Sequence, residues 1–241
     1  MISQSAIRTF NDPEYCDILW EESYLNGWRS YPTKAMLHGL YFEQYVIGST
    51  RGGEIYEIPK LKGGGPSKEQ RDLDKLIESA KKTIDNLGIK ILEVQPEWEH
   101  KDLIGHPDAL ITYKGERAIM DLKYTGTRED ESCRWNPYAW GKDLELKDYS
   151  QAVHYVEMYY RIHGEYLPFF YLVFGKSGWV KFISIDITEE TLEDYRDTIE
   201  RFRADLKDFT PLPSTDYNVC EKCKLQCSKR AIKPNVINIE Y

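Results

Sequence analysis

The chain lacks the features that would hold a protein in a membrane or along a polyanion. No apolar run approaches the roughly 18 residues of a membrane-spanning helix, and the opening Met-Ile-Ser-Gln-Ser has no secretion-signal hydrophobic segment. The 32 Lys and Arg are outnumbered by 40 Asp and Glu, which gives a net charge of −8. We therefore expect a cytoplasmic protein without a membrane partner, whose contacts with nucleic acid are local. Such contacts could come from bound metal or from a basic cluster of Lys222, Lys224, Lys229, Arg230 and Lys233.

Cysteine is scarce, with five in 241 residues. An odd number in a chain without a sign of export points to metal or cluster ligation before disulfides. Cys220, Cys223 and Cys227 fall within eight residues, and their Cys-x-x-Cys spacing suits thiolate ligands. Such a site needs a fourth ligand, and Cys133, far from the other four, is expected to be a free thiol.

The length and composition predict a single substantial core. A chain of 241 residues with 41% hydrophobic and 13% aromatic residues can bury one such core, with at most a small appended lobe. Residues 1 to about 48 are predicted to be helical. In that stretch Thr33 can cap a helix that runs to Ile47 and ends at Gly48. Its apolar stripe is Met36, Leu40 and Ile47.

Glu43 lies on that stripe. A carboxylate on a core-facing line usually has a partner. It could belong to a structural ion pair or a frayed helix end, or it could have a function.

A second helix is predicted after a glycine-rich connection. Ser67 and Gln70 fit a capping box, and Gly88 ends the helix. Its buried stripe is Leu73, Leu76, Ile77, Ala80, Ile84 and Leu87.

Strands and helices are then predicted to alternate. Strands are expected at 90–99, 107–113 and 117–124, and an irregular segment follows to Lys147. A helix from Asp148 or Ser150 to about His163 precedes a hairpin of residues 166–174 and 179–187, and Thr188 caps a last amphipathic helix. Trp135, Tyr138 and Trp140 of the irregular segment could stack on DNA bases or pack over the core edge.

The most informative stretch runs from Gly105 to Lys123. Short apolar runs flank Lys114-Gly115, as in a hairpin. A two-residue turn there pairs Tyr113 with Glu116 and puts Asp108 opposite Asp121, with Cβ atoms roughly 5 Å apart. Two facing carboxylates need a compensating cation, for which a divalent metal is the obvious choice.

Lys123 belongs to the same arrangement. Strand side chains alternate, so Lys123 projects on the side of Asp121 while Leu122 points into the opposite layer. A slip of one residue in the turn would move Asp121 to the other face. In the predicted register, the stretch indicates a metal-dependent phosphodiesterase centre.

Gln151 and Tyr155 follow on the next helix. They are four residues apart and share a helix face. Such a pair is common and alone is more often structural, but it comes directly after the Asp-x-Lys hairpin.

The order of these motifs resembles the PD-(D/E)XK nucleases of the RecB-like branch, over nearly the whole chain. That branch includes the RecB and AddB nuclease domains, the CRISPR-adaptation iron-sulfur nucleases and phage exonucleases. The matching stretches are Gly39 to Glu43, Gly105-His-Pro-Asp108, Asp121-Leu-Lys123, Lys123-Tyr-Thr-Gly126 and Gln151-x-x-x-Tyr155.

The resemblance implies roles for these residues. Glu43, Asp108 and Asp121 would bind Mg²⁺ or Mn²⁺ together with the backbone carbonyl of Leu122. Lys123 would orient or help deprotonate the attacking water and stabilise charge on the scissile phosphate. The remaining pair, Gln151 and Tyr155, would support the site and contact the DNA backbone.

The resemblance also implies a 4Fe-4S cluster. Some relatives hold one with three C-terminal cysteines and one near the N-terminus, after an opening that Ser3-Gln-Ser5 resembles. Cys16 would then join Cys220, Cys223 and Cys227 and tie the two ends of the chain together. The same thiolates could instead bind Zn²⁺ or remain unligated.

These observations predict an α/β fold with a restriction-endonuclease-like core, a mixed central sheet flanked by helices. The single domain, 1–241, would comprise a helical lobe and linker (1–66), a catalytic core (67–210) and a cysteine-bearing tail (211–241).

The expected function is metal-dependent cleavage of DNA, exonucleolytic on single strands or duplex ends. Recombination, repair, replication or CRISPR adaptation is the implied setting, with recombination, helicase or CRISPR-adaptation proteins as partners. The alternative is a catalytically idle DNA-binding or scaffolding module. The presence of Asp108, Asp121 and Lys123 together argues against that alternative.

Overall fold

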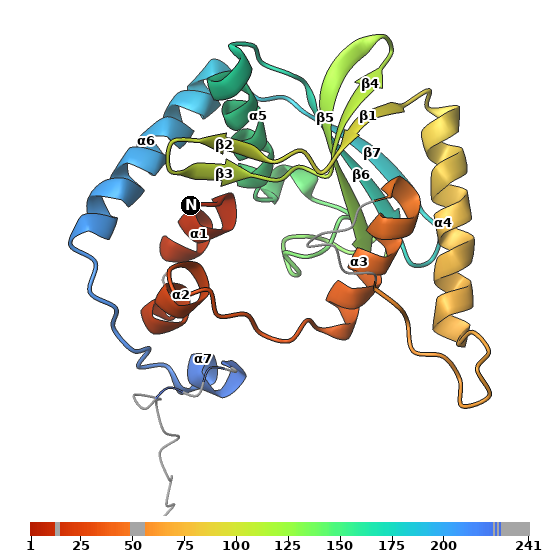
Figure 1. Cartoon of the computed structure of the whole chain (residues 1–241), viewed down its shortest axis with the longest axis horizontal. Coiled ribbons are helices and arrows are strands. Elements are labelled where there is room, and N and C mark those ends of the chain that lie inside the picture. Colours follow the sequence, from red (N-terminus) through yellow and green to blue (C-terminus); the bar gives the residue numbers. More distant parts are fainter. Residues whose placement is uncertain (13–14, 49–55, 224, 226, 228–241) are drawn as a thin grey trace, which may run out of the picture. The chain divides into compact units, whose positions relative to one another are not determined.

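The computed structural model describes the chain except for residues 13–14, 49–55, 224, 226 and 228–241, and except for the side chains of Tyr217 and Lys222 (Figure 1). It divides into two compact units. The first consists of Pro32–Tyr195 with Met1, and the second of Ile2–Tyr31 with Arg196–Tyr241. The basic cluster expected from Lys222 to Lys233 lies outside the described side chains.

A mixed five-stranded sheet forms the centre of the first unit. Its strand order is β1-β4-β5-β6-β7, in which β5 and β6 are parallel and the other neighbours antiparallel. This sheet and its helices confirm the predicted α/β class. The bounds are β1 Lys90–Val94, β4 Ala109–Tyr113, β5 Glu116–Thr125, β6 Phe169–Gly175 and β7 Val180–Ile185.

Helices cover both faces of the sheet (Figure 1). Helices α3 (Lys34–Ile47) and α4 (Lys68–Asn86) share a core with alternate residues of β4, β5 and β6, among them Met120 and Leu122. On the other face, α5 (Ser150–His163) brings Tyr155 to Phe169, with ring centroids 6.3 Å apart. Asp121 and Lys123 alternate with Met120 and Leu122, so they project toward the α5 face.

The capping residues of α3 and α4 lie where the sequence predicts them. Thr33 accepts a hydrogen bond from the N–H of Met36 at 3.3 Å, and Ser67 accepts one from Gln70 at 3.1 Å. Gly48 ends α3 in the left-handed region, at φ +80°. The predicted stripe of α4 is buried up to Ile84, whereas the side chain of Met36 is 54% exposed and does not belong to the core.

The hairpin between β4 and β5 has the predicted register. Lys114 and Gly115 both have positive φ, 52° and 88°, as a two-residue type I′ turn requires. Tyr113 pairs with Glu116, and the ladder continues to Ala109 opposite Met120. One step further out, Asp108 therefore lies opposite Asp121.

The strand predicted at 90–99 is interrupted. Gln95 adopts φ +48° and Pro96 lacks the N–H that a ladder needs, so β1 ends at Val94. The chain then forms a separate two-stranded sheet of β2 (Trp98–His100) and β3 (Leu103–Gly105).

The rest of the first unit follows the prediction. Helix α5 ends at His163, β6 and β7 form the expected hairpin, and Thr188 accepts a hydrogen bond from Thr191 at the start of α6 (Glu189–Lys207). Between β5 and α5, the irregular segment contains only a short 3-10 helix, η2 (Leu144–Leu146).

The second unit joins the two ends of the chain. It contains α1 (Gln4–Phe10), α2 (Asp17–Tyr24), the end of α6 and α7 (Tyr217–Lys222). Phe10 packs edge-on against Phe202, with ring centroids 4.9 Å apart, and Trp20 donates to the carbonyl of Ala6 at 2.8 Å.

The N-terminal stretch is helical, as predicted, and contains the three helices α1, α2 and α3. Helix α3 belongs to the unit of the sheet. No helix within the described ranges is both long and apolar enough to cross a bilayer.

Candidate active site

Asp108 and Asp121 form the centre of the candidate site. Each is only 1% exposed. Oδ2 of Asp108 accepts a hydrogen bond from the N–H of Leu122 at 2.8 Å, which fastens the start of β4 to β5. The N–H and C=O of one strand residue point to the same side of the strand, so the carbonyl of Leu122 is directed toward Asp108.

Lys123 adds a positive charge to this pair. Its ammonium group forms an ion pair with Asp121 and lies 5.6 Å from the centre of the Tyr171 ring. Burial, together with the charge of Asp121, raises the pKa of Tyr171, so its phenol stays protonated. Two carboxylates and one ammonium group leave this cluster with one negative charge in excess.

A chain of hydrogen bonds leads from Lys123 to α5. Lys123 donates to Gln151 Oε1 at 3.0 Å, and Gln151 donates to the hydroxyl of Tyr155 at 3.2 Å. Tyr155 donates in turn to the carbonyl of His106 at 2.9 Å, two residues before Asp108. The structure therefore brings together Asp108, Asp121, Lys123, Gln151 and Tyr155.

Glu43 is connected to the site through Gln95. The carboxylate of Glu43 is 8% exposed and accepts a hydrogen bond from Gln95 Nε2 at 2.8 Å. The N–H of Gln95 donates to the carbonyl of Asp108 at 2.9 Å. The left-handed backbone of Gln95 is a conformation that concentrates at functional sites. Sequence reasoning missed this residue, and the Pro96 that follows it was the available signal.

His154 is a buried polar residue that sequence reasoning also missed. It is 1% exposed. Its Nε2 lies 2.8 Å from the carbonyl of Ile104, which can only accept, so Nε2 carries the proton and Nδ1 accepts from the hydroxyl of Tyr195 at 2.8 Å. The imidazole thereby joins α5 to β3 and α6.

We expect this histidine to destabilise the fold in mild acid. Burial, above all, lowers the pKa of His154 from 6.5 to about 4. As the pH falls through 6.5, this histidine takes up a proton in the unfolded chain but not yet in the folded chain. The free energy of unfolding therefore decreases between pH 6.5 and 4, by roughly 3 kcal/mol at most. Urea unfolding at steps from pH 7.5 to 4.5 measures this loss. The pH dependence should be weaker in His154→Gln, and equal slopes for both proteins would contradict the assignment.

The segment between β5 and α5 packs some of its aromatic residues and exposes others. Trp140 lies against Tyr171 with ring centroids 4.9 Å apart, and the ammonium group of Lys147 is 4.2 Å from its ring. Trp135 and Tyr138 are 84% and 80% exposed. Of the three aromatic residues Trp135, Tyr138 and Trp140, Trp140 is therefore the one that packs over the core edge.

All four cysteines of the predicted cluster lie in the second unit. Cys16 and Cys220 are buried, and Cys223 and Cys227 are partly exposed. Burial raises the pKa of Tyr15, with smaller contributions from Cys223 and Cys16, so both thiols are near this phenol. The structure describes all five cysteines and joins none in a disulfide. The remaining thiol, Cys133, donates to the carbonyl of Asp143 at 2.7 Å.

Neither predicted ligand set is gathered into a complete site. Among the described residues, no three His, Cys, Asp or Glu side chains lie close enough together to hold a metal ion. Asp108 and Asp121 therefore form a pair, Gln95 links Glu43 to it by the hydrogen bonds described above, and the four thiols share a unit without three of them meeting at one point.

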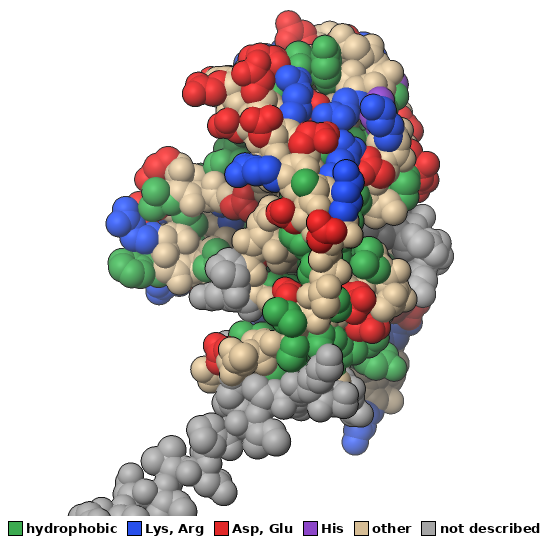
Figure 2. Space-filling model, turned by 90° about the vertical axis from the view of Figure 1, so that its left-hand side faces the viewer, with side chains coloured by type: hydrophobic (Ala, Val, Ile, Leu, Met, Phe, Trp, Pro, Cys, Tyr) green, Lys and Arg blue, Asp and Glu red, His purple; other side chains and the backbone are tan. Residues whose placement is uncertain are grey.

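Surface charge is mixed. On the face shown in Figure 2, acidic and basic side chains are interspersed, and the described residues form no continuous basic surface there. This agrees with the net charge of −8.

Comparisons with known proteins identify the fold. A protein of Eubacterium rectale, provisionally named an exonuclease, superposes with a TM-score of 0.66 and 19% sequence identity, over 98% of this chain and 90% of its own. The chain shares that fold. An alkaline exonuclease of Laribacter hongkongensis matches 86% of this chain and 87% of its own at 12% identity, with a TM-score of 0.45. Neither a protein-family model nor a curated protein matches the sequence.

Proposed function

We propose that the protein is a metal-dependent deoxyribonuclease that removes nucleotides from single-stranded DNA or from duplex ends. The observation that carries this proposal is the buried pair Asp108 and Asp121, joined through Lys123 to the hydrogen-bond chain on α5. The name of the Eubacterium rectale protein, whose fold this chain shares, supports the exonuclease class. Recombination, repair, replication or CRISPR adaptation is the proposed setting.

Each residue has a role that follows from its contacts. Lys123 neutralises part of the charge on the scissile phosphate and orients the attacking water. Gln151 holds the ammonium group of Lys123 in position, and Tyr155 fixes the amide of Gln151 through its own bond to the backbone. This support reduces the reorganisation needed when the phosphate arrives.

The donor set fits a hard divalent cation. The two carboxylates and the Leu122 carbonyl offer only oxygen, the ligand that Mg²⁺ and Mn²⁺ prefer. The excess negative charge of the buried cluster favours a cation in the same place. A bound ion would polarise a phosphoryl oxygen and acidify the attacking water.

End-labelled single-stranded and duplex DNA, incubated with Mg²⁺ or Mn²⁺ and with EDTA, tests the proposal. We expect mononucleotides or short products released from the ends, and none with EDTA. A closed circular single strand serves as the control for end dependence. Intact DNA under all metal conditions would contradict the nuclease assignment and favour the idle DNA-binding module.

Glu43 is proposed to complete the metal site by leaving Gln95. We expect Glu43→Gln to raise the metal concentration for half-maximal activity by about tenfold, because one charged ligand is lost. Its melting temperature should change less than that of a core variant such as Phe42→Ala. Gln95→Ala is the matched variant, because it removes the hydrogen bond from Gln95 and leaves the charge of the carboxylate. An unchanged metal dependence in Glu43→Gln would return Glu43 to a structural role.

The cysteines of the second unit are proposed to hold a 4Fe-4S cluster, with Zn²⁺ as the alternative. Anaerobically purified protein should then be brown, absorb broadly near about 400 nm and contain iron. Cys220→Ser should lose the colour and unfold at lower temperature, because ligation contributes to folding, whereas Cys133→Ser should keep the colour. Colourless protein with stoichiometric zinc would favour the alternative, and metal-free protein would remove the site.

A further inference from the structure

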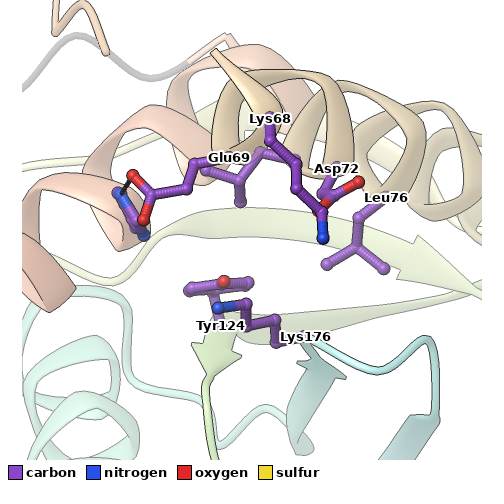
Figure 3. A pocket seen from close by; sticks show the side chains of 8 residues that line it. Lys68, Glu69, Asp72, Leu76, Tyr124 and Lys176 are labelled. Atoms are coloured by element: carbon purple, nitrogen blue, oxygen red, sulfur yellow. Dashed lines mark ion pairs between the residues drawn. The ribbon is translucent and has the colours of Figure 1, made fainter. Parts of the chain in front are cut away.

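A cavity of about 290 Å³ lies in the first unit, apart from the facing aspartates (Figure 3). Its walls come from α3, from the start of α4, from the end of β5 and from the turn after β6. The residues that matter for its chemistry are His38, Lys68, Asp72, Leu76, Tyr124 and Lys176. Its volume is at the lower end of the range for ligand pockets, roughly 300 to 1,000 Å³, so it suits a small ligand.

The walls suit a flat ring. Figure 3 shows the Tyr124 ring edge-on, with Lys68, Asp72 and Leu76 of α4 on the opposite side of the cavity. Leu73 and Leu76 give that side an apolar surface. The ring of Tyr124 is backed by Phe42, with centroids 5.5 Å apart. Any of the four bases can stack on such an aromatic ring, because every base has a π face.

The charges suit a phosphate beside that ring. Lys68 and Lys176 approach from α4 and from the strand side. The carboxylate of Glu69 also lines the cavity and forms an ion pair with Lys34 at 2.5 Å. The positive end of the 19-residue α4 helix adds to the attraction for an anion. Asp72 supplies an acceptor for the amino group of a base.

The cavity and the candidate active site share strand β5. Tyr124 follows Lys123 on β5, and the two side chains lie on opposite faces of the sheet. Strand β4 begins at Ala109, opposite Met120, so the last residues of β5 extend beyond the paired part of β4. Two residues of β-strand span roughly 7 Å, so Leu122 and Tyr124 are separated by about this distance along β5, and a DNA strand bound at both must pass the edge of β5 that β4 leaves unpaired.

We propose that this cavity binds one nucleotide of the DNA strand being cleaved, with its base between Tyr124 and Leu76 and a phosphate on Lys68 and Lys176. The inference rests on the proposed nuclease function for the identity of the strand. The substrate would then be DNA with one unstacked nucleotide, which single strands and frayed duplex ends provide.

Binding of a deoxynucleoside monophosphate in EDTA tests the site without catalysis. Calorimetry with dAMP and dTMP should show binding to the wild-type chain. It should be weakened at least tenfold in the double variant Lys68→Gln with Lys176→Gln. Lys75→Gln is the matched control, because this exposed lysine of α4 does not line the cavity. Failure of the wild type to bind, or equal binding by the double variant, would overturn the proposal.

Competition separates a nucleotide within a strand from a free nucleotide. A short single-stranded oligonucleotide should displace bound dAMP from the non-cleaving Asp121→Asn variant. If the oligonucleotide binds without displacing dAMP, the cavity takes free nucleotides only and the proposal fails.

A cleavage assay separates the two proposals. The double lysine variant should raise KM for single-stranded DNA more than it lowers kcat. If the wild-type chain cleaves DNA but binds no mononucleotide, the proposal for the cavity is rejected and the nuclease proposal stands. If the chain binds mononucleotides but cleaves no DNA, the proposed nuclease function is rejected instead.

Discussion

Asp121→Asn is expected to abolish DNA cleavage while the chain stays folded. The amide keeps the size of the side chain but removes the charge that would hold the metal. The loss should be at least on the order of 10³-fold, more than the roughly 10² to 10³ typical of removing one electrostatic donor. Asp108→Asn should behave alike, because its carboxylate faces the same point and also accepts the N–H of Leu122.

Thermal unfolding with and without Mn²⁺ gives this prediction a readout besides activity. The wild-type chain should melt at a higher temperature with Mn²⁺, since a ligand that binds the native state stabilises it. That increase should disappear in Asp121→Asn. Asp130→Asn, an exposed change in the following loop, is the control. Activity within twofold of wild type in either aspartate variant would reject the site.

Lys123→Met is expected to lower kcat by roughly 10²- to 10³-fold, because the stem remains while the charge at the phosphate is lost. Lys114→Met, on the turn of the same hairpin, should leave kcat unchanged. The Mn²⁺-induced increase in melting temperature should persist in Lys123→Met, since lysine is no metal ligand. If that increase disappears as well, the ammonium group acts on the metal site rather than on the phosphate.

A double-variant cycle distinguishes support from direct action. Gln151 reaches the site through Lys123, at 3.0 Å. Gln151→Leu should therefore lower kcat about tenfold in the wild-type background and have almost no further effect in Lys123→Met. Equal effects in both backgrounds would mean that Gln151 contacts the DNA independently.

The sequence predicts those parts of the fold that local chemistry determines. Thr33, Gly48 and Ser67 mark helix ends because their side chains or backbones satisfy groups that a helix leaves unpaired. Lys114-Gly115 sets the hairpin register because a two-residue turn with positive φ at both positions matches the twist of the flanking strands. From that register the opposition of Asp108 and Asp121 follows.

The remaining features depend on contacts between distant parts of the chain. The interruption at Gln95 and the bond from Gln95 to Glu43 join residues 52 positions apart. His154 is held by Ile104 and Tyr195, which no periodicity within α5 indicates. Met36 is a case in which local spacing gave a wrong prediction. Helical spacing puts it on the buried stripe of α3, but it is exposed in the structure.

The Lys114-Gly115 turn makes the active site sensitive to chain length at a place remote from chemistry. Side chains alternate along a strand, so one added or deleted residue in the turn would reverse the direction of every side chain on β5 relative to β4. A change of two residues would restore the faces and move Asp121 away from Asp108 by one repeat. In related sequences this hairpin should therefore keep a glycine at position 115, whose φ of 88° strains other residues, and should exclude insertions and deletions.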